Sequence, residues 1–325
     1  MDTTLSGIVR PYGRWLASLV LIACSWLWPQ LVEAHALPLA IGLIALLGIP
    51  HGATDYALYK HLQDRPLRAR EKAWFFIRYI GLMAIYGLWW WASPGSALVF
   101  FLLLSVFHFG QSNWHDLRLS APGRIGFYLS WGLFVLGLPL LWHVGQTAAI
   151  LQEILYQPLP ALSDAWRYGI LACLGLGSAV ALFGLRRSGQ ISRARFGRGL
   201  LDVILLAGVF LSTPLLLGFA VYFCLWHAWD AMAEQRTFLA KKIPDFTLLD
   251  YIRTALPFAA TALLGIGVLV WYMRSQQEAI GLGWMFVGVA LITLPHMLLV
   301  DFRFHRWQRK TADNLGGIKA RGLMV

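Results

Sequence analysis

The chain has 325 residues, of which 58% are hydrophobic and 13% are charged, and its formal net charge is +11. A soluble protein of this length cannot bury so much apolar surface, so the composition excludes a soluble fold and indicates an integral membrane protein. The basic residues stand in short runs between apolar segments, as in cytoplasmic loops beside anionic lipid, and this pattern argues against nucleic acid as a partner. The three cysteines lie in apolar segments without C-x-x-C spacing, and we expect Cys24, Cys173 and Cys224 to be packing residues.

The first half of the chain predicts five membrane spans. Apolar runs of spanning length cover residues 15–32, 36–59, 73–92, 96–114 and 125–144. The segment 65–72, between the second and third runs, holds four basic residues and one glutamate, which places it in the cytoplasm. The segment 145–164 alternates apolar and polar positions. We expect it to lie along the outer membrane interface or to cap a cavity.

The second half predicts five more spans. Residues 166–185 form the sixth, and a strongly basic cytoplasmic loop follows. The apolar run 199–235 is too long for one span, and a single crossing would put the basic loops before and after it on opposite sides. We therefore divide the run at Ser212-Thr213-Pro214 into a seventh and an eighth span. Residues 251–273 and 281–300 form the ninth and tenth.

The predicted fold is thus an all-α, polytopic membrane bundle of about ten transmembrane helices. An even number of crossings puts both termini and every strongly basic loop in the cytoplasm. We expect residues 1–325 to form one integral membrane domain in the inner (cytoplasmic) membrane of the cell.

Four histidines lie inside the even-numbered spans. His51, His108, His227 and His296 stand nine, ten, nine and seven residues before Lys60, Arg118, Arg236 and Arg303, the nearest basic residues on the predicted cytoplasmic side. At helical rise this puts all four about 10 to 15 Å in from that side. A single histidine in a membrane helix is often only hydrogen-bonded to a neighbouring helix, but four at one depth on separate helices predict a shared site.

Neutral imidazoles suit a first-row transition metal, and four of them suit Fe(II) with positions left for oxygen. We therefore expect His51, His108, His227 and His296 to be both the metal ligands and the catalytic residues. The remaining histidines are expected to be solvated or interfacial: His35 and His143 near the outer surface, and His61, His115 and His305 at or beyond the cytoplasmic boundary.

Carboxylates near these histidines suggest a second layer of contacts. Asp55 lies four residues after His51 and Asp230 three after His227, so each is expected to share a helix face with its histidine and to accept its free N–H. Asp301, five residues after His296, is expected instead to be a helix-end or interfacial charge. Two prolines, Pro50 and Pro295, immediately precede a histidine and predict a break in the backbone hydrogen bonding one turn earlier.

The motifs around the histidines resemble those of a known family. Pro50-His51-Gly52-Ala53-Thr54-Asp55, Phe107-His108-Phe109-Gly110, Trp226-His227 and Leu294-Pro295-His296-Met297 look like the successive signatures of the Brp/Blh family of membrane proteins. The resemblance runs from the second span to the last. It implies a non-haem Fe(II) oxygenase that adds O₂ across the central 15,15′ double bond of β-carotene and yields two retinals, with histidines of these motifs as iron ligands.

The chain departs from that family at one position. Members often carry a second histidine four residues after the one matching His227, where this chain has Ala231. Three readings stay open: His296 completes the iron shell, the site has three histidines, or the activity has changed.

A carotene dissolves in the bilayer, so an intramembrane site can take it directly from membrane lipid. Aromatic residues near the histidine layer are candidates for a tunnel around a rigid polyene, although such residues are more often packing or lipid-facing. They are Phe107, Phe109, Tyr222, Phe223, Trp226 and Trp229.

Two other classes of protein compete with an oxygenase. In a b-type haem protein the histidines would pair across the bundle as axial ligands, and a purified sample would show a Soret band. In a transporter of metal or small solutes they would line a path, with polar positions continuing outward on the same helices. The residues preceding His51 and His108 are almost entirely apolar and offer no such path.

Overall fold

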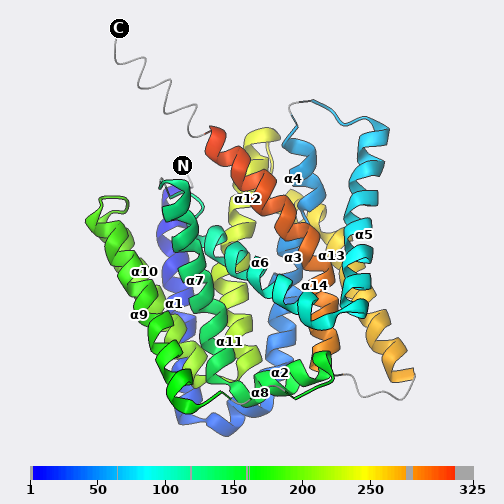
Figure 1. Ribbon diagram of the computed structural model, residues 1–325. Coiled ribbons are helices and arrows are strands. Elements are labelled where there is room, and N and C mark those ends of the chain that lie inside the picture. Colours follow the sequence, from blue (N-terminus) through cyan, green and yellow to red (C-terminus); the bar gives the residue numbers. More distant parts are fainter. Residues whose placement is uncertain are drawn as a thin grey trace.

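The computed structural model describes residues 3–63, 65–117, 119–158, 160, 162–275 and 281–311. Within these ranges the chain is helical throughout its regular structure, so the predicted all-α, polytopic class is confirmed. The helices run side by side, and the described chain starts and finishes at the same end of the bundle (Figure 1). Which side of a membrane this end faces remains a prediction, and Arg118 lies outside the described residues.

The helices follow one another with short connections. In chain order, with π-helical turns labelled η, they are α1 (Thr3–Leu27), α2 (Pro29–Leu43), η1 (Ile44–Gly48), α3 (Ile49–Gly52), α4 (Asp55–His61), α5 (Ala69–Ala92), α6 (Pro94–Trp114), α7 (Ala121–Trp142), α8 (Val144–Leu155), α9 (Asp164–Arg187), α10 (Arg193–Ser212), α11 (Leu215–Tyr222), η2 (Phe223–Ala228), α12 (Trp229–Lys242), α13 (Leu248–Ser275), α14 (Leu282–Leu299) and η3 (Val300–Phe304).

Eight of the described helical segments are long and apolar enough to cross a membrane. The two other predicted spans are α1, whose apolar part Tyr12–Leu27 is short, and α10, which carries several charged residues. These two helices pack against each other (Figure 1). Arg14 of α1 forms an ion pair of 3.1 Å with Asp202 of α10. The opposite charges of the two less apolar helices therefore neutralise each other.

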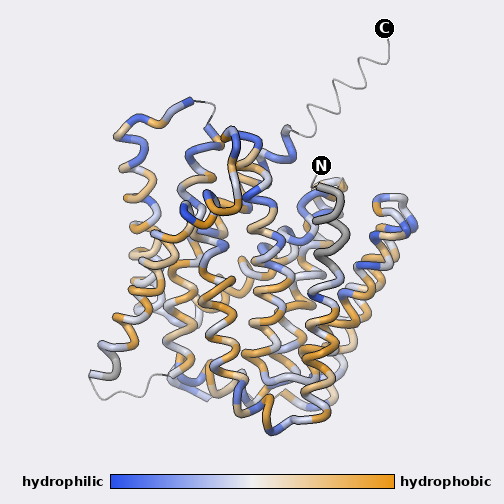
Figure 2. Tube along the Cα trace, turned by 180° about the vertical axis from the view of Figure 1, so that it is seen from behind, coloured by the Kyte–Doolittle hydropathy of each residue, from blue (hydrophilic) through white to orange (hydrophobic). Residues whose placement is uncertain are grey.

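Hydrophobic residues dominate the middle of the bundle, and hydrophilic residues gather at the end where the described chain starts (Figure 2). This distribution is expected of a bundle surrounded by lipid. The predicted break at Ser212-Thr213-Pro214 is present, because α10 ends at Ser212 and α11 begins at Leu215. The first connection differs: α2 already begins at Pro29, whereas the sequence predicted a span reaching residue 32. Proline at the first helical position needs no amide hydrogen, which explains the early start.

The amphipathic helix α8 lies across the end of the bundle opposite the described chain ends (Figure 1). It packs on α6, α7 and α14. Glu153 of α8 accepts a hydrogen bond of 2.8 Å from the backbone N–H of Gly283 in the first turn of α14. The interfacial or capping position expected for residues 145–164 therefore matches the part of that segment that forms α8.

Three π-helical turns interrupt the helices that carry histidines. Each closes with a backbone bond spanning five residues: Ile49 to Ile44, Trp229 to Cys224, and His305 to Val300. The first precedes Pro50, as predicted, because proline cannot donate the bond that a regular helix needs there. Pro295 lies inside α14, where it cannot donate the hydrogen bond to the preceding turn, but the helix continues through it and the π-helical turn η3 follows.

Two glycines let α6 and α7 cross with their backbones in contact. A methyl group on Gly110 would overlap the carbonyl oxygen of Tyr128, and one on Gly132 would overlap the carbonyl oxygen of Val106. Small residues at such crossings permit the close approach that drives helix association in lipid. The crossing fixes the position of α6, which brings His108 to the centre of the bundle.

We expect Gly132→Ala to destabilise the protein by about 1–3 kcal/mol, because overlapping backbone atoms must separate. Gly126→Ala in the same helix is the matched control, since nothing lies within 4 Å of its added methyl group. The measurement is the thermal unfolding midpoint of each purified variant in detergent. Equal midpoints for the two variants would contradict the close crossing.

Candidate metal centre

The four predicted histidines converge on one place. His51 of α3, His108 of α6, His227 of η2 and His296 of α14 are all buried, with exposed fractions of 5% or less. Ring centroids are 5.1 Å apart for His51 and His227, 4.8 Å for His51 and His296, 4.9 Å for His108 and His227, and 5.7 Å for His108 and His296. Each ring thus contacts two others edge to face. We call these residues the histidine cluster.

Small residues make room for the cluster. A methyl group on Gly48 would lie 2.7 Å from the ring of Phe223, and one on Gly52 would lie 3.4 Å from Nδ1 of His296. The glycines on either side of His51 therefore let side chains from η2 and α14 approach the backbone that carries this histidine.

Hydrogen bonds fix the orientation of three rings. His108 Nδ1 donates to Asp301 Oδ1 and His296 Nδ1 donates to Asp55 Oδ1, each at 2.8 Å. His51 Nδ1 faces the carbonyl oxygen of Gly48. A ring that donates from Nδ1 keeps a lone pair on Nε2, which is the form that binds a metal.

Four of the remaining ring nitrogens are buried without a hydrogen-bond partner among the described residues. These are Nε2 of His51, Nε2 of His108 and both nitrogens of His227. Buried polar atoms are rarely left unsatisfied unless a ligand or ion serves them. Three helices thus present unpaired imidazole nitrogens at one point, and this donor set fits a first-row transition metal.

The cluster is looser than an ordinary coordination shell. Among the described residues, the group whose ligand atoms all lie within 4.8 Å of one another is a different one, His115, Glu234 and His305. Metal–imidazole bonds are about 2.1 Å long, so a shared metal in the histidine cluster requires small rotations that bring the rings closer together.

Asp55 lies at the cluster but with a different partner from the one predicted. It accepts from His296, and Tyr79 donates to its second oxygen at 2.9 Å. The prediction assumed one continuous helix from His51 to Asp55. Instead α3 ends at Gly52 and α4 begins at Asp55, so the intervening turn directs the carboxylate toward α14.

The predictions for the other two aspartates are wrong. Asp301 is not an interfacial charge: it is 1% exposed and holds His108. Asp230 is not hydrogen-bonded to His227; its side chain is 41% exposed and bonds Arg14 at 2.8 Å. The π-helical turns η2 and η3 explain both differences, because a wider turn rotates the following residues away from the face that α-helical spacing gives.

Two of the six predicted tunnel residues touch the histidine cluster. The ring centroid of Phe109 is 4.9 Å from that of His227, and Phe223 lies 5.2 Å from His51 and 5.4 Å from His227. The other four have different surroundings: Phe107 stacks on Phe302, Tyr222 donates to Asn113, Trp226 lies against Arg14, and Trp229 is 47% exposed. A substrate tunnel stays a prediction.

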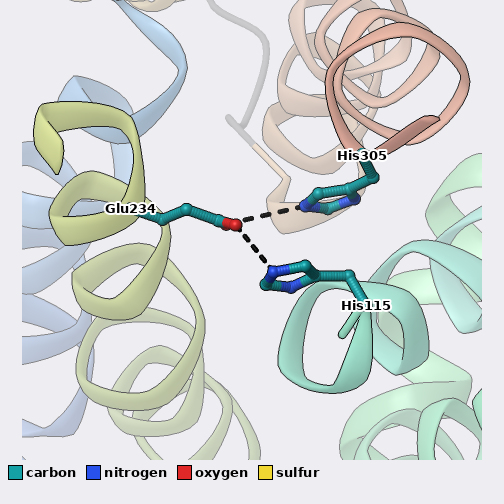
Figure 3. Close-up of side chains that lie close together, drawn as sticks. All are labelled: His115, Glu234 and His305. Atoms are coloured by element: carbon teal, nitrogen blue, oxygen red, sulfur yellow. Dashed lines mark ion pairs between the residues drawn. The ribbon is translucent and has the colours of Figure 1, made fainter. Parts of the chain in front are cut away.

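Sequence reasoning missed a second polar group. His305 was expected at the solvated boundary, but it is 1% exposed. It stacks on His115 with ring centroids 4.7 Å apart, and both face Glu234 (Figure 3). The signal was present in the spacing: His115 follows His108 by seven residues, and Glu234 follows His227 by seven. Residues seven positions apart lie on the same face of a helix, two turns apart, so this spacing indicates a second polar layer next to the histidine cluster.

The fold and the cluster define a polytopic helical membrane protein with imidazoles gathered inside the bundle. The family model described as β-carotene 15,15′-dioxygenase matches residues 42–303, and the chain belongs to this family. The family resemblance seen in the motifs is thereby confirmed.

Two relatives match most of the chain. The β-carotene 15,15′-dioxygenase of an uncultured marine bacterium, 66A03, is 27% identical over 275 residues, which cover 82% of this chain and 93% of the relative. The probable β-carotene 15,15′-dioxygenase Blh of Halobacterium salinarum is 24% identical over 279 residues, which cover 79% of this chain and 81% of the relative. No solved structure matches the chain significantly.

We expect Asp301→Ala to destabilise the protein by about 1–3 kcal/mol, because it leaves the buried Nδ1–H of His108 without an acceptor. Asp230→Ala removes the same group from a more exposed ion pair and should cost less than about 1 kcal/mol. Chemical denaturation in detergent measures both. A larger loss for Asp230→Ala would show that the assignment of the buried partner is wrong.

Proposed function

We propose that the protein is a non-haem Fe(II) oxygenase that cleaves β-carotene, or a related carotenoid, with O₂ at the central 15,15′ bond to give retinal. The observation that carries this proposal is the histidine cluster, in a chain that belongs to the β-carotene 15,15′-dioxygenase family. We further propose that it acts in the inner membrane, where a carotene enters from the surrounding lipid.

In this proposal His51, His108, His227 and His296 hold the iron. When bound, Fe(II) supplies the activation of O₂ that protein side chains cannot provide. The chain's own contribution is positioning. Asp55 and Asp301 keep Nδ1 protonated on their histidines, so that Nε2 is the ligand atom, and the aromatic rings of Phe109 and Phe223 shield the cluster from water.

The position of Ala231 supports one of the three readings left open above. Ala231 lines a small cavity of about 10 Å³ together with His108, His227, His296 and His305. A family histidine at this position would therefore face the histidine cluster. In this chain His296 contacts His51 and His108, which supports the reading in which His296 completes the iron shell.

The contacts within the cluster argue against the haem alternative. A b-type haem needs a flat slot between two axial imidazoles, wide enough for the porphyrin. In the histidine cluster each ring lies within 5.7 Å of two others, so any two paired rings have a third imidazole beside them where the macrocycle would extend.

The decisive experiment is expression in a bacterium that accumulates β-carotene, followed by extraction. We expect loss of the orange colour and formation of retinal with the wild-type chain. His51→Ala should abolish retinal and lower bound iron, because it removes a ligand. His35→Ala is the control, since His35 is exposed and should be dispensable. Retinal formed by His51→Ala would contradict the proposal, and iron retained with carotene uncleaved would leave a metal site but exclude the reaction.

A second prediction concerns the aromatic rings. Phe223→Leu should lower the rate of carotene cleavage by roughly tenfold, because a displaced polyene reacts more slowly, while bound iron is unchanged. Trp229→Leu is the matched control, because Trp229 is about half exposed and should leave the rate close to that of the wild type. Retinal formation and iron content are measured together. An unchanged rate for Phe223→Leu would remove this residue from the substrate path.

A further inference from the structure

The second polar group consists of one residue from each of three helical segments. His115 follows α6, Glu234 lies in α12 and His305 follows η3 (Figure 3). Nε2 of His115 is 2.7 Å from Oε1 of Glu234, and Nε2 of His305 is 3.6 Å from Oε2. The two rings are parallel, with an interplanar angle of 3°. All three side chains are largely or fully buried, with exposed fractions of 25% or less.

The other nitrogen of each ring faces an oxygen acceptor. Nδ1 of His115 lies 3.2 Å from the carbonyl oxygen of Ser112, and Nδ1 of His305 lies 3.2 Å from Oε1 of Gln111. Each Nδ1–H therefore donates to an oxygen, which leaves Nε2 of the neutral ring with a lone pair. Both lone pairs point toward the Glu234 carboxylate, which carries only acceptors when ionised. A cation is needed between them.

Protons satisfy this arrangement poorly. Protonating both rings would place two imidazolium ions face to face at a centroid distance of 4.7 Å, with His305 fully buried. A single divalent ion bound to both Nε2 atoms and to the carboxylate cancels the lone-pair repulsion and keeps both rings neutral.

We propose that His115, Glu234 and His305 form a second metal site, which takes a divalent first-row transition ion. Two histidines and one carboxylate are a ligand set common to zinc and non-haem iron sites. The ligand atoms already lie within 4.8 Å of one another. The acceptors Ser112 and Gln111 fix the tautomer in the way that partners of metal-binding histidines do.

The second site is connected to the histidine cluster. Asp301 Oδ1 lies 2.8 Å from Nδ1 of His108 and 3.9 Å from Nδ1 of His305. The cavity beside Ala231 is lined by members of both groups. The three segments that supply the second site also carry His108, His227 and His296, so an ion there would fix their relative positions.

Metal stoichiometry tests the proposal. The full-length protein in detergent is stripped with a chelator, loaded with Zn²⁺ alone, passed through a desalting column and measured by mass spectrometry of the metal. We expect about two equivalents per chain, falling to about one in Glu234→Gln and in His51→Gln, because each variant loses ligands of one site only. Glu71→Gln is the control, since Glu71 pairs with Arg65 at the surface and should keep about two.

The variants separate this proposal from the proposed iron site. Two equivalents of Zn²⁺ bound to folded Glu234→Gln would overturn the second site. The second site would also be overturned if the wild-type chain bound only one equivalent of Zn²⁺ and only His51→Gln lost it. A single equivalent lost only in Glu234→Gln would support the second site and contradict metal binding by the histidine cluster. If Glu234→Gln does not fold, His115→Asn at the end of its helix provides the same comparison.

Discussion

The structure depends on placing four imidazoles where water cannot solvate them. Each polar ring nitrogen inside the bundle needs a partner, because an unsatisfied polar group in an apolar setting costs about 1–3 kcal/mol. Two partners are aspartates from other helices, Asp55 for His296 and Asp301 for His108. The partners in these pairs are 241 and 193 residues apart in the sequence. The hydrogen bonds that satisfy the buried imidazoles therefore also specify which helices pack together.

Backbone irregularity makes this meeting possible. The π-helical turn η1 lies just before His51, η2 contains His227, and η3 contains Asp301. A wider turn changes the direction of the side chains on it without breaking the helix, and such turns are frequent at functional sites. Gly110 and Gly132 allow α6 to lie against α7, which brings His108 inward. The local departures from regular packing are therefore concentrated around one point.

Much of this arrangement could be predicted from the sequence. The parts that could not be predicted share a single cause. The apolar runs and the basic loops predict the helices, and the similar spacing of the four histidines from basic residues, seven to ten positions, predicts their common depth. The aspartate partners could not be predicted, because spacing rules assume a regular α-helix. The turn before Asp55 and the π-helical turns near Asp230 and Asp301 change the face on which each carboxylate lies.

The extent of the polar region also bears on function. From the histidine cluster it continues two turns toward the end where the described chain starts, through Glu234 and His305. In the opposite direction the buried side chains of α6 and α14 near the cluster are apolar apart from Ser105, among them Phe101, Ala290 and Leu294. A path for ions or solutes needs polar groups along its whole length. A polar region that ends inside the bundle, closed by packed apolar residues, therefore argues against such a path.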